Sequence, residues 1–361
     1  MMNIFTEIIS QQLQLPKAGV DNTLKLLDEG CTIPFISRYR KERTGNLNEV
    51  QITQISDLND KLKDLSKRKE TIVKTITEQE KMTPDLQQRI EQCWDATELE
   101  DIYLPFKPKR RTRAQVAREQ GLEPLAQLIM LQRERNPEQA ARRYVGGDVI
   151  TTTELALQGA KDIIAEDINE NEQSRNQLRA AFRREAVITS KVVKTKKDTD
   201  EAQKYRDYFD FSEPLKRCSS HRLLAIRRGE NEGILRVSIS PDDEDAILRL
   251  QRQYVRYNSP CGNLIKEAAE DCYKRLLKPS IENEFAALSK ERADDEAIRV
   301  FAENLRQLLL SAPLGQKRVM GIDPGFRTGC KVVCLDALGN LLHHEAVFPH
   351  PPVAHRMQAT I

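Results

Sequence analysis

The sequence has few of the residues that build sheets and loops. Of its 361 residues only 15 are glycine and 5% are aromatic, while runs rich in Glu, Lys, Gln, Leu and Ala favour helix for most of the length. It also lacks any apolar run near the roughly 18 residues of a membrane span, and its start, MMNIFTEIISQQLQL, lacks the basic and apolar regions of a signal peptide. The sequence therefore predicts a mainly helical cytoplasmic protein with no membrane partner.

Other absences exclude classes of function. The seven cysteines, an odd number scattered between Cys31 and Cys334, indicate reduced thiols and not a disulfide framework. No Gly-rich phosphate loop is present, so the sequence does not support an NTPase, and no cofactor is predicted. The 57 basic and 55 acidic side chains leave a net charge of only +2, so any attraction to nucleic acid must come from local clusters of cations.

One long amphipathic helix is predicted between Asn48 and about Gln79. Apolar residues recur there at steps of three and four, the spacing of one helix face, and Lys69 interrupts the row. After it, Thr83 supplies an N-cap and Pro84 suits the first helical position, so a new helix is expected to begin there. Shorter helices are predicted over 97–104 and 114–133, and two more, separated by the cap Asn171, between Thr152 and about Val187.

The second half of the chain adds strand signals. HRLLAIRRGENEG predicts a helix that ends at Gly229, and the alternation of apolar and polar residues in ILRVSIS predicts one short strand near 234–240 inside a helical domain. A pair of long helices is predicted over 261–310. The sequence Ser-Ala-Pro-Leu-Gly that follows is the best candidate for a domain boundary.

A basic loop is the first candidate binding site. The first seven residues of KPKRRTRAQVAR carry five cations without an acid, and two prolines, one within the stretch and one just upstream, keep the segment out of a helix. Such a loop can neutralise several phosphates, and contacts to the backbone alone bind RNA or DNA without reading the sequence. The alternative is a solvated loop, or one held by the acidic run ELED just before it. The five cations are Lys107, Lys109, Arg110, Arg111 and Arg113.

A second basic cluster lies in SRYRKERTGNL. It holds Arg38, Arg40, Lys41 and Arg43, with Tyr39 available for stacking, and we take the first three as candidate nucleic-acid contacts. Because the run is short and contains an acid, a helical face with internal salt bridges is the alternative. The pair Arg227 and Arg228 is expected only to offset the negative end of a helix dipole.

Several long stretches resemble the bacterial Tex family of transcription accessory proteins. They are IPFISRYRKERTGNL, ELEDIYLPFKPKRRTRAQVAREQGLEPLA, HRLLAIRRGE, and the segment from CGNLIKEAAED to VMGIDPGFRTGCKV. The resemblance covers nearly the whole chain in order. It implies a protein that binds nucleic acid and acts around transcription and RNA handling, with RNA or DNA, and RNA polymerase or other transcription machinery, as partners.

The resemblance also implies a fold. It is a mainly α, elongated N-terminal module with a helix-turn-helix-like unit and one small strand region, followed by the first strands of a YqgF-type, RNase H-like domain. The expected domains are a helical region with the basic loop at 1–190, its helical continuation at 191–314 and a truncated YqgF-type domain at 315–361. Family members continue into helix-hairpin-helix modules and an OB-fold RNA-binding domain, so we expect this chain to be a fragment or a truncated member.

Asp323 is the weak catalytic candidate. It stands where RNase H-like nucleases have the first acid of a two-metal site, but such a site needs three or four carboxylates from distant strands. KRVMGID and GCKVVCLD predict an antiparallel hairpin, and Leu338-Gly339-Asn340 predicts a turn into a third strand. Asp336 and Glu345 belong to the same hairpin system and suit turn and surface positions. Asp323 is therefore predicted to be a fold position, in a turn with Pro324-Gly325.

No metal site is predicted in the last strands. Cys330 and Cys334 fall on one face of a strand, which suits burial, and His343 and His344 point to opposite faces, although His350 and His355 follow. The predicted function is a non-enzymatic, nucleic-acid-binding scaffold around transcription. The alternatives are a metal-dependent RNase H-like nuclease or resolvase, and a protein-interaction scaffold without direct nucleic-acid contact.

Overall fold

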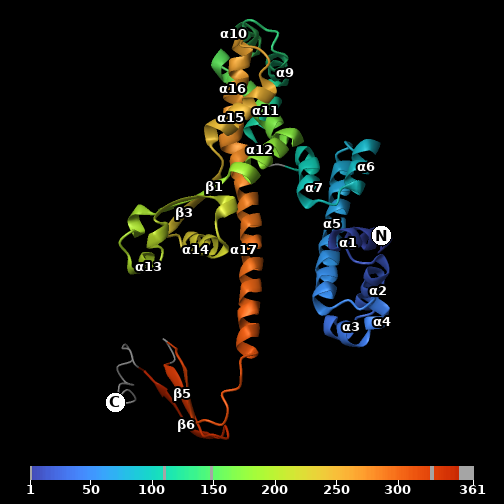
Figure 1. Ribbon diagram of the computed structural model, residues 1–361. Helices are drawn as coiled ribbons and strands as arrows, with labels where there is room; N and C mark the ends of the chain where they lie inside the picture. Colours follow the sequence, from blue (N-terminus) through green and yellow to red (C-terminus); the bar gives the residue numbers. More distant parts are fainter. Residues whose placement is uncertain (1, 109–110, 147–148, 326–328, 349–361) are drawn as a thin grey trace. The chain divides into compact units, whose positions relative to one another are not determined.

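The computed structural model is mainly helical (Figure 1), and it describes residues 2–108, 111–146, 149–325 and 329–348. Its residues form two compact units, 1–290 and 291–361. The prediction of a mainly α protein that ends in the first strands of a small sheet is confirmed. The domain limits at residues 190 and 314, and the helix-turn-helix-like unit, stay predictions.

The N-terminal part of the first unit is built from helices around the long helix α5. In order, the elements are α1 (Met2–Leu13), α2 (Lys17–Asp28), α3 (Ile33–Tyr39), α4 (Lys41–Thr44), α5 (Glu49–Glu78), α6 (Pro84–Gln92), α7 (Ala96–Tyr103) and the 3-10 turn η1 (Leu104–Phe106). The predicted long helix is confirmed. It begins with a capping box, in which Asn48 accepts a hydrogen bond from the Gln51 amide and Gln51 accepts one from the Asn48 amide.

Lys69, the interruption in the apolar row of α5, is buried. Its side chain is on the packed face, where Nζ donates to the Glu91 carbonyl oxygen at 2.8 Å and lies 3.5 Å from the centroid of the Trp94 ring. Burial lowers the pKa of Lys69. The lysine therefore joins α5 to the end of α6 through a hydrogen bond and a cation–π contact.

The first two helices after the basic loop are separated by a break that the sequence analysis did not predict. They are α8 (Arg113–Glu119), α9 (Glu123–Leu131), α10 (Pro137–Ala141), the 3-10 turn η2 (Arg142–Tyr144), α11 (Thr153–Glu170) and α12 (Glu172–Glu185). The single helix predicted over 114–133 is wrong, because Gly121 takes a φ of +78° and ends α8, and Pro124 starts α9. The predicted cap is confirmed: Asn171 accepts a hydrogen bond from the Ser174 amide at 3.0 Å.

A small antiparallel sheet lies within this helical unit. Its elements are β1 (Val187–Val192), α13 (Asp200–Gln203), β2 (Asp210–Pro214), α14 (Ser220–Asn231) and β3 (Leu235–Ser240), with 3-10 turns η3 (Lys194–Lys196), η4 (Arg206–Tyr208) and η5 (Leu215–Arg217). The strand order is β2-β1-β3, so the prediction of a lone strand is wrong. The β-branched run in VITSKV was a usable signal for β1, whereas DFSEP is too short and polar to predict β2.

The predicted end of α14 is also wrong. The helix continues past Gly229, which is buried. Leu235 packs so closely against this glycine that an added Cβ would lie 2.7 Å from the Leu235 Cδ1 atom. The helix ends where Gly233 takes a φ of +66°, the left-handed conformation that glycine adopts without strain. The first glycine therefore allows close packing, and the second one ends the helix.

One continuous helical run replaces the predicted pair of helices over 261–310. After α15 (Asp243–Tyr254) come α16 (Pro260–Cys272), a π-helical segment η6 (Tyr273–Leu277) and α17 (Lys278–Leu309) without a gap. Pro279 lacks an amide hydrogen, and its ring would clash with the carbonyl group four residues earlier in an α-helix. The wider π turn just before it accommodates the proline, so the hydrogen-bond pattern changes locally and the helical run continues.

The second unit contains the end of α17 and a three-stranded antiparallel sheet. The strands are β4 (Val319–Asp323), β5 (Cys330–Leu335) and β6 (Leu341–Val347), in the order β4-β5-β6, which confirms the predicted hairpin and third strand. Asp336 forms the predicted turn, since one of its carboxylate oxygens accepts hydrogen bonds from the Leu338 and Asn340 amides, both at 2.8 Å.

Candidate nucleic-acid interface

The basic loop connects η1 to α8 and is tied down at both ends. Gln79 donates a hydrogen bond to the Phe106 carbonyl oxygen at 2.7 Å before the loop, and Thr112 caps α8 after it. Lys107, Arg111 and Arg113 are exposed. Arg111 pairs with Glu119 at 3.0 Å but leaves 71% of its side chain exposed, so this pair is weak. The candidates Lys109 and Arg110 lie outside the described residues.

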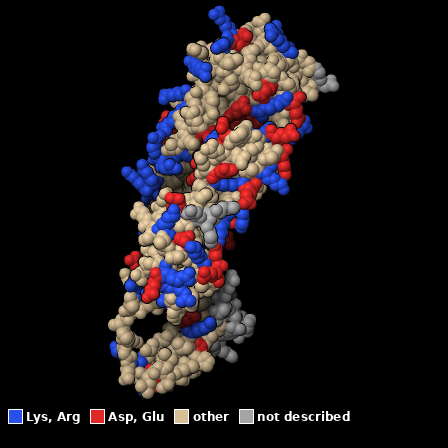
Figure 2. Space-filling model, turned by 90° about the vertical axis from the view of Figure 1, so that its right-hand side faces the viewer, with Lys and Arg blue, Asp and Glu red and all other residues tan. Residues whose placement is uncertain are grey.

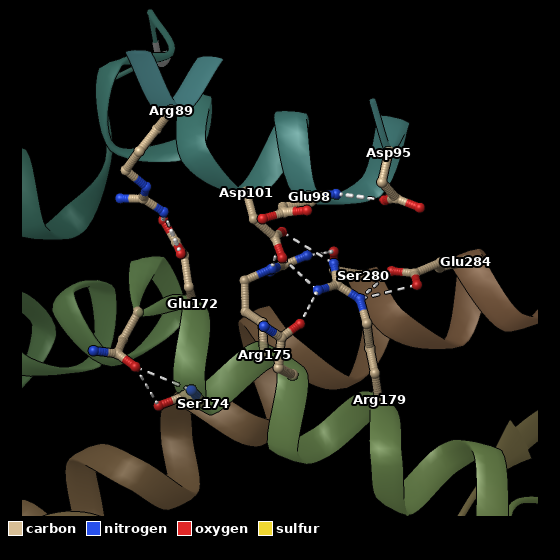
Figure 3. A network of polar contacts seen from close by, with 12 residues as sticks. Arg89, Asp95, Glu98, Asp101, Glu172, Ser174, Arg175, Arg179, Ser280 and Glu284 are labelled. Atoms are coloured by element: carbon tan, nitrogen blue, oxygen red, sulfur yellow. Dashed lines mark hydrogen bonds and ion pairs between the residues drawn. The ribbon is translucent and has the colours of Figure 1, made fainter. Parts of the chain in front are cut away.

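Two acids of the preceding run ELED pair with other arginines. Glu100 pairs with Arg68, with distances of 2.6 Å and 3.1 Å between the two nitrogens and the two oxygens. Asp101 is only 4% exposed and points toward Arg175 and Arg179 (Figure 3). Neither carboxylate pairs with a described cation of the loop, so the alternative of a loop held by these two acids is not supported.

Local clustering of charge is visible on the surface. In Figure 2, Lys and Arg side chains gather along the left margin of the face in view, whereas acidic and basic side chains alternate over much of the rest. A net charge of only +2 therefore does not prevent positive patches. The candidate contacts remain a prediction that depends on which of these cations reach a phosphate.

The second basic cluster lies on α3 and α4, at the opposite end of the N-terminal helices from the basic loop (Figure 1). Its cations are exposed, and Arg40 lies over the Phe35 ring at 4.9 Å from the centroid. Tyr39 is 67% exposed, as stacking on a base would require. Within the described residues no ion pair involves the basic side chains at positions 38, 40, 41 or 43, so the alternative of an internally paired face is not supported.

A buried polar network, which the sequence did not predict, sets the direction of α7 just before the loop (Figure 3). Arg175 and Arg179 extend from α12 toward Asp101 on α7. Arg175 Nε donates to Asp101 at 2.7 Å, and Arg179 donates to both of its carboxylate oxygens. Arg179 also pairs with Glu284 on α17 at 2.9 Å, and Arg175 donates to Ser280 at 3.2 Å.

A second ion pair joins another N-terminal helix, α6, to α12 at the surface. Arg89 on α6 pairs with Glu172, in the first turn of α12, at 2.8 Å. Together with the Asp101 network it fastens the N-terminal helices to α12 and α17. The only sequence signal was the pair of arginines four residues apart on α12, and nothing in the sequence indicated their partner 74 and 78 residues earlier.

Just after the loop, Arg118 on α8 holds a group of acids. It donates to Glu123 at 2.8 Å, to Asp167 at 2.7 Å and to Glu166. Burial raises the pKa of Asp167 to about 6, and nearby carboxylates add to this effect while Arg118 opposes it. Burial also raises the pKa of Asp162, and Arg275 and then Arg113 oppose that shift. The end of the loop therefore adjoins the acidic face of α11.

The raised pKa of Asp167 predicts a pH-dependent stability. A raised pKa in the folded state stabilises the protein fully below the unfolded pKa, near 3.8, and the contribution is lost as the pH rises through about 6. Asp167→Asn removes this titration, so the variant should melt higher than the wild type at pH 7.5 and by a clearly smaller margin at pH 4.5. Because the Asp167 side chain is 49% exposed, we expect a gain of only about 1 to 3 °C in calorimetry. A gain of equal size at both pH values would contradict the assignment, and Asp60→Asn on α5 controls for loss of an exposed carboxylate.

The other sequence candidates do not assemble into a site. Asp323 is exposed at the end of β4, opposite Lys331 in register, and Glu345 is exposed on β6 beside His343 at 3.4 Å. Within residues 2–108, 111–146, 149–325 and 329–348, no three His, Cys, Asp or Glu side chains are placed to hold a metal ion. His350 and His355 lie outside these ranges. In the same part of the chain no helix is long and apolar enough to cross a membrane.

Comparison with known proteins finds three family models in succession. Residues 3–77 match the Tex-like protein N-terminal domain, residues 132–301 match the Tex central region-like model, and residues 317–361 match the Tex protein YqgF-like domain. The basic loop lies between the first two matches.

Named relatives match over nearly all of this chain. It is 39% identical over 355 residues to the transcriptional accessory protein Tex of Neisseria gonorrhoeae, which covers 97% of this chain and 46% of that protein. It is 40% identical over 348 residues to protein tex of Bordetella pertussis, covering 92% and 44%. The human S1 RNA-binding domain-containing protein 1 is 28% identical over 358 residues, covering 95% and 36%. The chain thus spans less than half the length of these relatives.

Proposed function

Because the chain belongs to the Tex family, we propose that it binds the phosphate backbone of nucleic acid around transcription, as an accessory protein without a catalytic role. The exposed basic loop between η1 and α8 is the observation that carries this proposal. Its setting would be the cytoplasm, with RNA or DNA, and RNA polymerase or other transcription machinery, as partners.

The geometry supports contacts to backbone more than contacts to bases. Of the described loop cations, Lys107 and Arg111 stand on a short connection between helices and Arg113 begins α8, and no described helix or strand presents them as a row that could enter a groove. Guanidinium groups match phosphate oxygens in a two-pronged arrangement, which gives affinity without sequence preference. The polar network of Asp101 supports the loop by holding α7 in place.

The nuclease alternative has less support. Its one favourable observation is the match to a YqgF-like domain, but the described residues bring no pair of acids to Asp323. A single exposed carboxylate holds a hard cation poorly in water. The third alternative is a scaffold that contacts only proteins. It predicts no salt-dependent binding of nucleic acid, whereas the proposal predicts such binding.

The experiment compares the wild-type chain with the variant Lys107→Ala/Arg111→Ala/Arg113→Ala. Binding of RNA and DNA of the same sequence is measured by fluorescence anisotropy over a range of salt concentrations. We expect the variant to bind both more weakly and to lose about 0.7 to 0.9 of the slope of log affinity against log salt for each contact removed. The control Lys74→Ala/Lys81→Ala/Lys216→Ala removes three exposed cations elsewhere.

Two results would contradict the proposal. One is a loop variant that binds nucleic acid as tightly as the control variant does. The other is Mg²⁺-dependent cleavage of the oligonucleotides that Asp323→Ala abolishes, which would establish the nuclease alternative. The proposal expects Asp323→Ala to change neither binding nor its dependence on Mg²⁺.

A further inference from the structure

Five exposed arginines lie on the segments that follow α9, α10 and α15, in the part of the first unit where α9 packs against both α10 and α16 (Figure 1). Two of them are in the turn after α9, two are in η2 and one is in the connection from α15 to α16. We call this surface the arginine tip, and it also includes Tyr257. The five arginines are Arg133, Arg135, Arg142, Arg143 and Arg256.

Gln132 holds the two connections side by side. It is 6% exposed and ends α9 in the left-handed conformation, with a φ of 56°. Its side-chain amide donates to the Tyr254 carbonyl oxygen at 2.8 Å, and its oxygen accepts from the Arg256 amide at 2.9 Å and the Tyr257 amide at 3.4 Å. A non-glycine residue in this conformation is uncommon, and it persists here because three hydrogen bonds hold its side chain.

Further contacts make the arrangement rigid. The Cys261 thiol, at the start of α16, donates to the Glu134 carbonyl oxygen at 3.3 Å. Gly262 allows the connection to pass close to α16, since an added Cβ would lie 2.4 Å from the Tyr257 carbonyl oxygen. The backbone that carries Arg133, Arg135 and Arg256 is therefore ordered before any ligand binds, which lowers the entropy cost of binding.

The arginines of the tip are not used inside the protein. Among the described residues no ion pair involves any of the five, and none of them stacks on an aromatic ring. Of the acids nearby in sequence, Glu134 uses a carboxylate oxygen to accept the Asn136 amide at 2.8 Å, and Glu138 is exposed on α10. Like charges held together on rigid backbone repel one another, so fold stability does not account for the cluster.

Tyr257 adds a second property to the surface. Its side chain is 63% exposed and directly follows Arg256 in the connection that Gln132 holds. An exposed aromatic ring beside several guanidinium groups can stack on an unpaired base while the arginines contact the phosphates on either side. In a duplex the base faces are covered by neighbouring base pairs, so the ring would find no partner.

We propose that the arginine tip binds single-stranded nucleic acid, with its arginines on successive phosphates and Tyr257 stacked on a base. The proposal takes the ligand class from the function proposed above. It uses different residues from the basic loop, however, and predicts a preference for single strands that backbone contacts alone would not give.

The test uses the full chain and labelled single strands of about twelve nucleotides, with the matching duplex as the comparison. Arg133→Ala/Arg135→Ala/Arg256→Ala should reduce the salt slope for single strands by about 2, at about 0.7 for each contact. Tyr257→Ala should weaken single-strand binding roughly five- to hundredfold and leave duplex binding unchanged, and Tyr257→Phe should retain the binding. The control Arg183→Ala/Arg184→Ala/Arg299→Ala removes three exposed arginines from other surfaces.

The outcomes separate the two proposals. If the basic-loop variant loses binding and the tip variant matches its control, the tip proposal is overturned and the loop proposal stands; the reverse result supports the tip alone. A Tyr257→Ala variant with unchanged single-strand binding overturns the stacking contact. Equal binding of an oligoglutamate and an oligonucleotide at the tip would assign the surface to acidic proteins and overturn the proposal, and no binding by the wild type at low salt would overturn both.

Discussion

Replacing Asp101 with alanine should lower the free energy of unfolding of the first unit by about 3 to 5 kcal/mol. The carboxylate is the shared partner of two guanidinium groups, and the side chains of Arg175 and Arg179 are each 8% exposed. Removing it leaves two positive charges in a site with little water. Arg179 keeps its pair with Glu284 and Arg175 keeps its hydrogen bond to Ser280, so we expect the lower half of the range.

The measurement is urea unfolding followed by circular dichroism, with Asp60→Ala on α5 as a control that removes an exposed acid and should cost at most about 0.5 kcal/mol. Asp101→Asn keeps the shape but not the charge, and should fall between the wild type and the alanine variant. A loss below about 1 kcal/mol for Asp101→Ala would show that the network does not hold α7 to α12.

Phe182→Ala should destabilise the same unit by a similar amount, about 3 to 5 kcal/mol, for a different physical reason. Phe182 on α12 is 1% exposed, and its ring centroid lies 5.3 Å from that of Phe285 on α17. The truncation loses the transfer free energy of the ring and leaves a cavity that helices already bonded by the Arg179 pairs cannot close.

The control for this second prediction is Phe182→Leu, which keeps most of the volume and should cost less than about 1.5 kcal/mol. Because the effect depends on apolar packing, it should not change with salt, whereas a charge network at the surface would. If Phe182→Ala and Phe182→Leu proved equally destabilising, the cavity explanation would be wrong. In that case the loss would come from the stacking geometry of the ring pair.

Elements with local causes could be predicted from the sequence. The capping box at Asn48, the cap at Asn171 and the turn at Asp336 each place donor and acceptor within a few residues of one another. These signals are complete in a short window of sequence. For the same reason the long helix α5, the junction of α11 with α12 and the final hairpin agree with the predictions.

Features that depend on contacts with another element were predicted wrongly or not predicted at all. Gly229 was taken as a helix end, but its role depends on Leu235 of the next strand packing against it. The strand β3 pairs with β1 at 187–192, which the sequence did not mark as its neighbour. The buried position of Lys69 depends on the Trp94 ring and the end of α6. Each of these required a contact that only folding creates.

The sequence by itself determined the family, the mainly helical fold and the presence of basic segments, because these follow from composition, periodicity and motifs in order along the chain. Only the tertiary structure decided which charges are available. Arg179 is buried against Asp101 and Glu284, whereas Arg133 is exposed in the arginine tip. The two residues are chemically identical. Whether a cation is neutralised depends on the carboxylates that folding brings near it, and for Arg179 one of them lies 78 and the other 105 residues away in the chain.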